Sequence, residues 1–280
     1  MKYLPFLDRQ HSDQTIFQLD YQYHTYLNNK FECRKEAIGK YYLEKELYPG
    51  TLIAVNKLLA GQLVKEYPAD FVLTEQKGHF IFHNKITGGT LEWKNDWIAI
   101  EHRSYISLFD ALSSQVQEDI AICQLENDRN WLAAIHLSAP NHWSPAEKIG
   151  KPFGDIHSVL PGMEKGSFIR FAWSISTDNR LNHHPVPPPG IDLTDWQGRG
   201  TEDNNGKIYL RVERQAIVGV PACNAFMFTI RTYFYDIDEL QADEKKALLM
   251  AVENMSPSSL EYKGLDNKTD VLRRRLQKIP

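Results

Sequence analysis

The sequence has few cysteines and carries no common metal-binding or nucleotide-binding signature. Its three cysteines, Cys33, Cys123 and Cys223, lie far apart and form no CxxC pair. This spacing excludes a zinc ribbon, and the chain cannot by itself supply the four thiolates of an iron–sulfur cluster. No HExxH, GxSxG, P-loop or GxGxxG segment occurs, so the usual signatures of zinc hydrolases, serine hydrolases and nucleotide-binding enzymes are also missing.

The chain also lacks an excess of charge and a long apolar run. A formal net charge of −4 and a pI near 6.2 give no basic surface for nucleic acid or for anionic lipid. No apolar run approaches the roughly 20 residues that span a bilayer, so no membrane association is expected. The first residues, MKYLPFLDRQHSDQ, lack the apolar core of a secretory signal, which predicts a cytoplasmic location.

With 42% hydrophobic residues, the 280-residue chain is long enough to bury a substantial core. Its hydrophobic periodicity predicts helices over Glu36–Leu47, Ala54–Lys65, Ser107–Gln117 and Asp243–Asn254. Strands are predicted over 71–73, 80–82, 90–93, 131–137 and 167–176. The predicted class is therefore α+β, as a single domain over 1–280. Residues 1–66 would form a helical N-terminal part, and residues 67–280 a mainly antiparallel sheet core with C-terminal helices.

The most informative segment is Lys207–Asp236, which reads KIYLRVERQAIVGVPACNAFMFTIRTYFYD. Two alternating stretches joined by a turn containing Gly219 and Pro221 predict an antiparallel hairpin. Pairing them about this turn places Arg211 near Arg231, and Glu213 near a threonine of the second strand. Arginines and a glutamate among tyrosines fit the lining of an anion-tolerant pocket. They fit a structural Arg–Glu network equally well.

Among ten histidines, His157 stands out by its context. It lies in GKPFGDIHSVLPG, bounded by glycines and prolines and flanked by Ile156 and Val159. A single imidazole in an apolar slot is what an axial haem ligand requires, and Arg170, Arg211 or Arg231 would then face the haem propionates. The alternative is a purely structural histidine. His183 and His184 are predicted to be a solvated loop pair, and His136 a buried histidine with its hydrogen bonds satisfied.

Several uncommon motifs run in the same order along the chain as in a known family. They are LVKEYPADF (63–71), SSQVQEDIAIC (113–123), HWSPAEKIGKPFGDIHSVLPG (142–162), DNRLNHHP (178–185) and LRVERQAIVGVPACNAFMFTIRTY (210–233). On these motifs the sequence resembles the haem-dependent oxidative N-demethylase α-subunit-like proteins. The resemblance covers nearly the whole chain.

The resemblance implies a PAS-like fold that binds haem b through its iron. It also implies oxidative removal of a methyl group from a small secondary amine, which consumes dioxygen and gives formaldehyde and a primary amine. Electrons would come from separate flavin and iron–sulfur reductase subunits. Carried over by position, His157 becomes the candidate axial ligand, and Arg211, Arg214 and Arg231 become candidates for cofactor contacts. Glu213 is the candidate catalytic residue, because a carboxylate can hold a protonated amine or relay protons.

Two other functions remain open on the sequence. The protein could be a non-catalytic PAS-like sensor of haem or another small ligand, because such folds host many sites without turnover. It could also be an assembly subunit that binds no haem. The sequence does not identify the amine.

Overall fold

The structure is a computed structural model that describes residues 15–127, 129–153, 167–196, 206–265 and 269–277. Its helices are α2 (Tyr23–Tyr41), α3 (Thr51–Glu66), α4 (Leu108–Ser113), α5 (Pro145–Lys148), α7 (Leu193–Trp196), α8 (Ala242–Glu253), α9 (Pro257–Tyr262) and α10 (Thr269–Leu276). Its strands are β1 (Tyr42–Glu44), β2 (Phe71–Gln76), β3 (His79–Asn84), β4 (Gly89–Lys94), β5 (Asp119–Glu126), β6 (Arg129–His136), β7 (Ser167–Ser176), β8 (Tyr209–Val220) and β9 (Ala225–Asp236). The predicted α+β class is confirmed.

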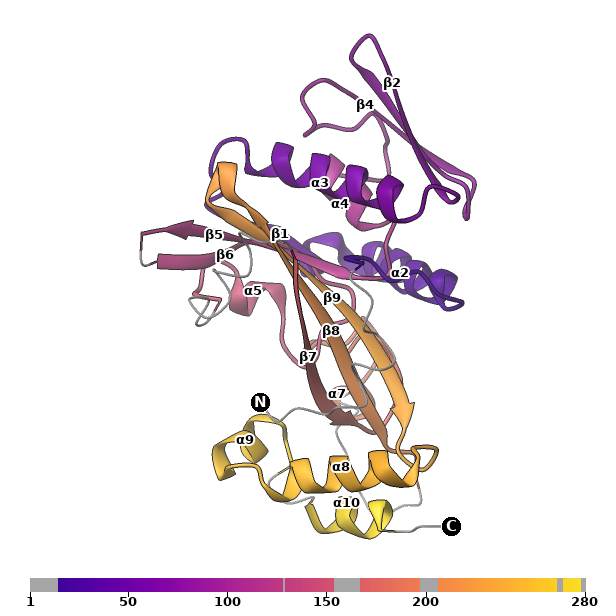
Figure 1. Cartoon of the computed structure of the whole chain (residues 1–280), viewed down its shortest axis with the longest axis vertical. Coiled ribbons are helices and arrows are strands. Elements are labelled where there is room, and N and C mark those ends of the chain that lie inside the picture. The colour runs from indigo at the N-terminus through magenta and orange to yellow at the C-terminus, as the bar shows by residue number, and fades with distance from the viewer. Residues whose placement is uncertain (1–14, 128, 154–166, 197–205, 266–268, 278–280) are drawn as a thin grey trace.

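Two antiparallel sheets organise these elements. The main sheet has the strand order β1-β6-β5-β9-β8-β7, and a smaller sheet has the order β2-β3-β4. The long strands β7, β8 and β9 run through the molecule, from α3 and the small sheet at one end to α8 and α10 at the other (Figure 1). The small sheet matches the three short strands predicted over 71–93.

Local sequence explains where several helices begin and what they bury. Ser107 caps α4 by accepting a hydrogen bond from the backbone N–H of Asp110, as its position before an apolar run predicts. Helix α3 buries Val55, Leu59 and Leu63, which are spaced four residues apart and so share one face. The helix predicted over Glu36–Leu47 instead ends at Tyr41, because the next residues pair as β1 with β6 of the main sheet.

The hairpin of β8 and β9 forms as predicted, but its register differs from the predicted one. Val220 pairs with Ala225, so the turn consists of Pro221–Cys223, a 3₁₀ turn, and Asn224, whose φ is 46°. Arg211 therefore pairs with Phe234, and Arg214 pairs with Arg231. The predicted proximity of Arg211 to Arg231 is wrong, because the turn is later than assumed and shifts the register by an odd number of residues. Such a shift moves side chains to the opposite face of a sheet.

The two faces of the main sheet carry different residues. The face that bears Arg211, Glu213 and Gln215 also bears Phe228 and Ile230, and we call it the Glu213 face. The face that bears Arg214 and Arg231 is called the Arg231 face. Apolar residues of the Glu213 face pack with Trp143, Ile149 and Phe153 from the segment after β6.

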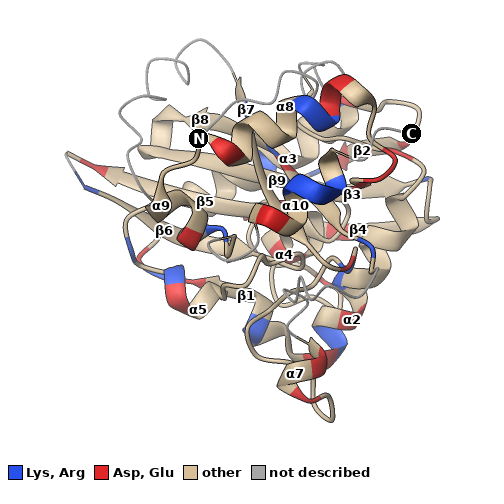
Figure 2. Ribbon diagram, turned by 90° about the horizontal axis from the view of Figure 1, so that it is seen from below, with Lys and Arg blue, Asp and Glu red and all other residues tan. Residues whose placement is uncertain are grey.

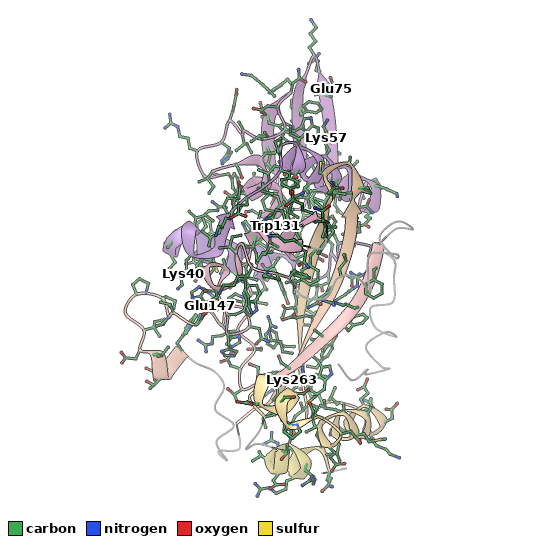
Figure 3. The ribbon with its side chains drawn as sticks, turned by 90° about the vertical axis from the view of Figure 1, so that its left-hand side faces the viewer. Lys40, Lys57, Glu75, Trp131, Glu147 and Lys263 are labelled. Atoms are coloured by element: carbon green, nitrogen blue, oxygen red, sulfur yellow. The ribbon has the colours of Figure 1, made fainter. Side chains whose placement is uncertain are left out.

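The Arg231 face is covered by different elements along its length. Near the turn of the hairpin it packs against α3 and α4, and α3 packs in turn against β2 of the small sheet. At the other end, Leu248 of α8 and Leu272 of α10 pack with Trp173, Leu210 and Val212. Lys263 joins this end to β7, because its Nζ donates to the carbonyl of Trp173 and lies 4.7 Å from the centroid of that ring (Figure 3).

Charged residues of both signs are interspersed along the ribbon (Figure 2). Helix α10 illustrates the pattern, because Asp270 precedes a run of three arginines that forms ion pairs with Glu253, Asp238 and Asp270 itself. Within the described part of the chain, no helix combines the length and the hydrophobicity that a membrane crossing needs.

Candidate functional site

Four side chains form a continuous hydrogen-bonded row on the Glu213 face. Arg170 Nε donates to Gln215 Oε1 at 2.8 Å, and Gln215 Nε2 donates to Glu213 Oε2 at 2.8 Å. The other carboxylate oxygen of Glu213 accepts a hydrogen bond from Arg211 Nη1. We call these four residues the polar row. It forms because every second residue of β8 points to the same face, which brings residues 211, 213 and 215 together. Arg170, on the neighbouring strand β7, is paired with Gln215 and therefore extends the row.

Arg211 anchors the buried end of the polar row. Its side chain is only 1% exposed, and Nη2 donates to the carbonyl of Ala139 at 2.8 Å and to Thr232 Oγ1 at 3.2 Å. Glu213 is 17% exposed, and both of its oxygens accept hydrogen bonds. The two hydrogen bonds fix the position of this carboxyl group from two sides.

Arg170 forms the exposed end of the polar row and lies beside an aromatic surface. Its guanidinium carbon is 5.7 Å from the centroid of Phe228. Phe153 packs edge-on against Phe226 and Phe228, with ring centroids 5.6 and 4.8 Å apart. Phe168, on the same face, is 37% exposed. This part of the sheet therefore combines apolar rings with a cation at their edge.

Arg214 and Arg231 lie on the opposite face and hold the chain segment Thr15–Asp20. Arg214 Nη2 donates to the carbonyl of Thr15 at 2.6 Å, and Arg231 Nη2 donates to Asp20 Oδ2 at 2.8 Å. Arg231 is fully buried, with its guanidinium over the ring of Tyr26 at 3.7 Å. The structure therefore separates the three predicted cofactor arginines. Arg211 lies beside Glu213, whereas Arg214 and Arg231 lie on the opposite face of the sheet.

Side chains satisfy the backbone of this segment almost completely. Successive backbone N–H groups of Ile16–Asp20 donate to Glu66, Glu66, Glu118, Tyr67 and Gln117. These side chains accept the hydrogen bonds that a neighbouring strand would otherwise accept. They connect the segment to the end of α3 and to the start of β5, and Arg214 connects it to β8. Arg214 and Arg231 thus have structural partners that their sequence context did not reveal.

Glu118 is the most perturbed carboxyl in this network. It is fully buried, and burial raises its pKa from 4.5 to about 7, against the opposing effect of Arg231 and Arg214. One oxygen accepts the N–H of Gln18 at 2.7 Å, and the other has no hydrogen-bond partner in the described structure. The folded chain therefore retains a proton on Glu118 at pH values where the unfolded chain has released it.

This pKa predicts a pH-dependent contribution to stability. Because the folded pKa is raised, the contribution is fully present below about pH 4.5 and is lost as the pH rises through about 7. The loss is about 3 kcal/mol, from 1.36 kcal/mol for each pKa unit. Urea unfolding of the wild type and of Glu118→Gln between pH 4.5 and 8 should show the difference between their unfolding free energies changing by this amount. Glu239→Gln, at an exposed site, should show no such change, and a constant difference for Glu118→Gln would contradict the assignment.

The histidines of the 183–184 pair are buried, so the prediction of a solvated loop pair is wrong. His183 Nε2 lies 2.8 Å from Asp178 Oδ1, and its ring stacks on His142 with centroids 5.1 Å apart. Partial burial would raise the pKa of Asp178, but its hydrogen bonds with His183 and Arg180 hold this pKa well below its usual range. His136 is buried as predicted, with Nε2 3.2 Å from Asp110 Oδ1, but the prediction that its hydrogen bonds are satisfied is wrong, because Nδ1 has no partner in the described structure. His157 lies outside the described residues.

A cavity of about 560 Å³ lies between α2 and residues 179–196. Cys33 and Glu36 of α2 and Leu181, Pro188 and Trp196 of the facing segment contribute to its lining. None of the predicted site residues that the structure describes lines it. Burial raises the pKa of the Cys33 thiol to about 12, which keeps this group protonated at neutral pH.

Three residues of the described site were not singled out from the sequence. Gln215 has a signal, because it alternates with Arg211 and Glu213 in the segment RVERQ. Glu118 and Asp178 lie in the recognised motifs SSQVQEDIAIC and DNRLNHHP, but no local pattern shows their partners. Their partners come from distant parts of the chain or from a loop whose burial was not predicted.

One family model covers both the residues of the polar row and the motifs found in the sequence. A family model described as "Haem-dependent oxidative N-demethylase, alpha subunit-like" matches residues 8–273. The matched range includes Arg170, Arg211, Glu213 and Gln215, as well as the segment held on the Arg231 face. This family description names both haem dependence and an alpha subunit. The chain therefore belongs to the haem-dependent oxidative N-demethylase, alpha subunit-like family.

Proposed function

We propose that the chain binds haem b against the Glu213 face and catalyses oxidative N-demethylation of a small secondary amine. Dioxygen is the co-substrate, and separate flavin and iron–sulfur reductase subunits supply the electrons. The observation that supports this most strongly is the polar row, which fixes a carboxylate beside an aromatic surface in a chain of this family. The PAS-like description of the sheet remains a prediction.

The described residues fit a haem group. Haem presents a large apolar ring with carboxylates at one edge, and the Glu213 face offers the exposed ring of Phe168 and the half-buried ring of Phe153, with Arg170 nearby. The described residues contain no group of three or more His, Cys, Asp or Glu side chains that could hold a bare metal ion. Haem iron does not need one, because it takes only one or two axial ligands from the protein.

His157 is the proposed axial ligand. The described residue Phe153 lies on the Glu213 face, and β7, which begins at Ser167, is the strand at that edge of the sheet. The segment that contains His157 is therefore joined to this part of the molecule at both ends. This connection supports a ligand on the Glu213 face.

The residues of the polar row have separate proposed roles. Bound haem would supply the oxidative chemistry that removes the methyl group. Glu213 holds the protonated amine or accepts its proton, with Arg211 and Gln215 keeping both carboxylate oxygens in place. The burial of Arg211 makes it a positioning residue for Glu213. We assign Arg214 and Arg231 to the Thr15–Asp20 segment, because this segment supplies acceptors for both guanidinium groups.

Haem reconstitution tests the proposal. The purified wild-type chain titrated with haem should give a Soret band with one haem per chain. His157→Ala should shift this band or weaken haem binding at least about 10-fold, which corresponds to 1.4 kcal/mol. His24→Ala provides the matched control, because His24 is an exposed residue of α2.

The outcomes separate the three candidate functions. A wild-type chain that binds no haem would leave the assembly subunit as the better description. Haem binding without formaldehyde production from amines, in the presence of a reductase, would favour the sensor. An unchanged Soret band in His157→Ala would remove this residue as the ligand without contradicting haem binding itself.

A further inference from the structure

Arg170 differs from the three arginines of the β8–β9 hairpin, because no described residue accepts a hydrogen bond from its Nη atoms. Within the described structure its only hydrogen bond runs from Nε to Gln215, and it forms no ion pair. Arg211, Arg214 and Arg231, in contrast, are at most 1% exposed and donate from their Nη atoms to carbonyl or carboxylate oxygens. No described residue occupies the two Nη groups of Arg170, and the exposure of this side chain leaves them open to a ligand.

The polar row fixes the direction of this available edge. Gln215 Oε1 accepts from Nε of Arg170, while Gln215 Nε2 is held by Glu213, which is held in turn by the buried Arg211. A guanidinium held through Nε keeps its Nη atoms free as a fork, the geometry that binds a carboxylate through two parallel hydrogen bonds. Because Arg211 and Gln215 already occupy both oxygens of Glu213, this carboxylate does not close the fork.

The surroundings of Arg170 select a particular kind of carboxylate. The guanidinium lies over Phe228, and Phe168 on the same face is 37% exposed. An apolar ring surface next to a cation fits a ligand with a flat apolar body and an acidic group at its edge. Phe228 is itself buried, so Phe168 is the exposed ring, and a small hydrophilic anion would leave it uncovered.

We propose that Arg170 is the carboxylate clamp of the Glu213 face and that it binds a haem propionate through its Nη atoms. The assignment rests on the proposed haem site, and it moves the propionate contact from the buried arginines to this residue. Gln215 is a positioning residue for the clamp. Arg170 thereby links the cofactor to Glu213 through one intervening side chain.

Titration with haem and with haem dimethyl ester tests the clamp, because the ester retains the ring and iron but has no free carboxylates. The wild type should bind haem at least about 10-fold more tightly than the ester, with Kd read from the Soret band. Arg170→Gln should weaken haem binding by about 10- to 100-fold and leave the Kd of the ester unchanged. Arg170→Lys should fall between them, since lysine retains the charge without the fork. The control Arg103→Gln, at an exposed site, should match the wild type.

The possible failures are distinguishable. If Arg170→Gln and Arg170→Lys both bind haem with wild-type affinity, the clamp assignment is wrong and the haem site stands. If Arg170→Gln weakens haem and ester equally, the residue supports the ring and does not bind the propionate, which also overturns the assignment. If the wild type binds neither compound, the proposed haem site is wrong and the clamp is wrong with it.

Discussion

Replacing Glu213 by glutamine is expected to lower the rate of formaldehyde production from a secondary amine by about 100-fold or more. Glutamine retains an oxygen that accepts the hydrogen bond of Arg211, so the buried guanidinium keeps a partner. It loses the negative charge that holds or deprotonates the amine. Haem affinity should change by less than about 3-fold, since the proposed propionate contact is made by Arg170. The measurement is single-turnover formaldehyde release, with haem content determined on the same sample.

Glu75→Gln is a suitable control for this experiment. Glu75 is an exposed residue of β2 and projects from the small sheet at the far end of the molecule (Figure 3). It should retain the full rate. A Glu213→Gln variant that binds haem and retains the wild-type rate would show that Glu213 has no part in the chemistry. A variant that loses haem would show that Glu213 acts on the cofactor site instead.

The second large effect concerns stability and the opposite face of the sheet. Arg231→Gln is expected to lower the free energy of unfolding by about 3 kcal/mol, because it removes one member of a buried, charged network. Asp20 loses its ion pair at 2.8 Å, and Glu118 loses its principal neighbouring cation. Urea denaturation measures this change. Arg274→Gln, in the last turn of α10, should change the free energy of unfolding by less than about 1 kcal/mol.

Haem affinity decides whether Arg231 is structural. Measured under conditions where Arg231→Gln remains folded, its Kd for haem should lie within about 2-fold of the wild type. A large loss of haem affinity with no loss of stability would place Arg231 at the cofactor. It would support the sequence-based prediction that Arg231 contacts the cofactor.

Elements with a local signature were predicted well from the sequence. The apolar spacing within α3, the serine before α4 and the alternation of β7 each depend on residues a few positions apart. Strand β5 was missed because IAIC is apolar at consecutive positions and buried on both faces, so it shows no alternation. Tyr42–Glu44 pairs with a strand about 90 residues later, and its own sequence gives no sign of this.

The candidate site was predictable only in part. Alternation correctly placed Arg211, Glu213 and Gln215 on one face of β8. Which residues of β9 share that face depends on the length of the turn, and the turn at Pro221–Asn224 reverses the predicted answer. The hydrogen bonds from Arg214 to Thr15 and Ile16 cross almost 200 positions of sequence. Such contacts follow from the packed fold, and no local pattern encodes them.

The central claim is that the cofactor lies on the Glu213 face, while the charges of the Arg231 face hold the chain together. A crystal structure of the haem-loaded protein tests it most directly. It should show the porphyrin against Phe168, with a propionate oxygen within hydrogen-bond distance of Arg170 and with Thr15–Asp20 still bound to Arg214 and Arg231. A porphyrin on the Arg231 face, in place of Thr15–Asp20, would contradict the account.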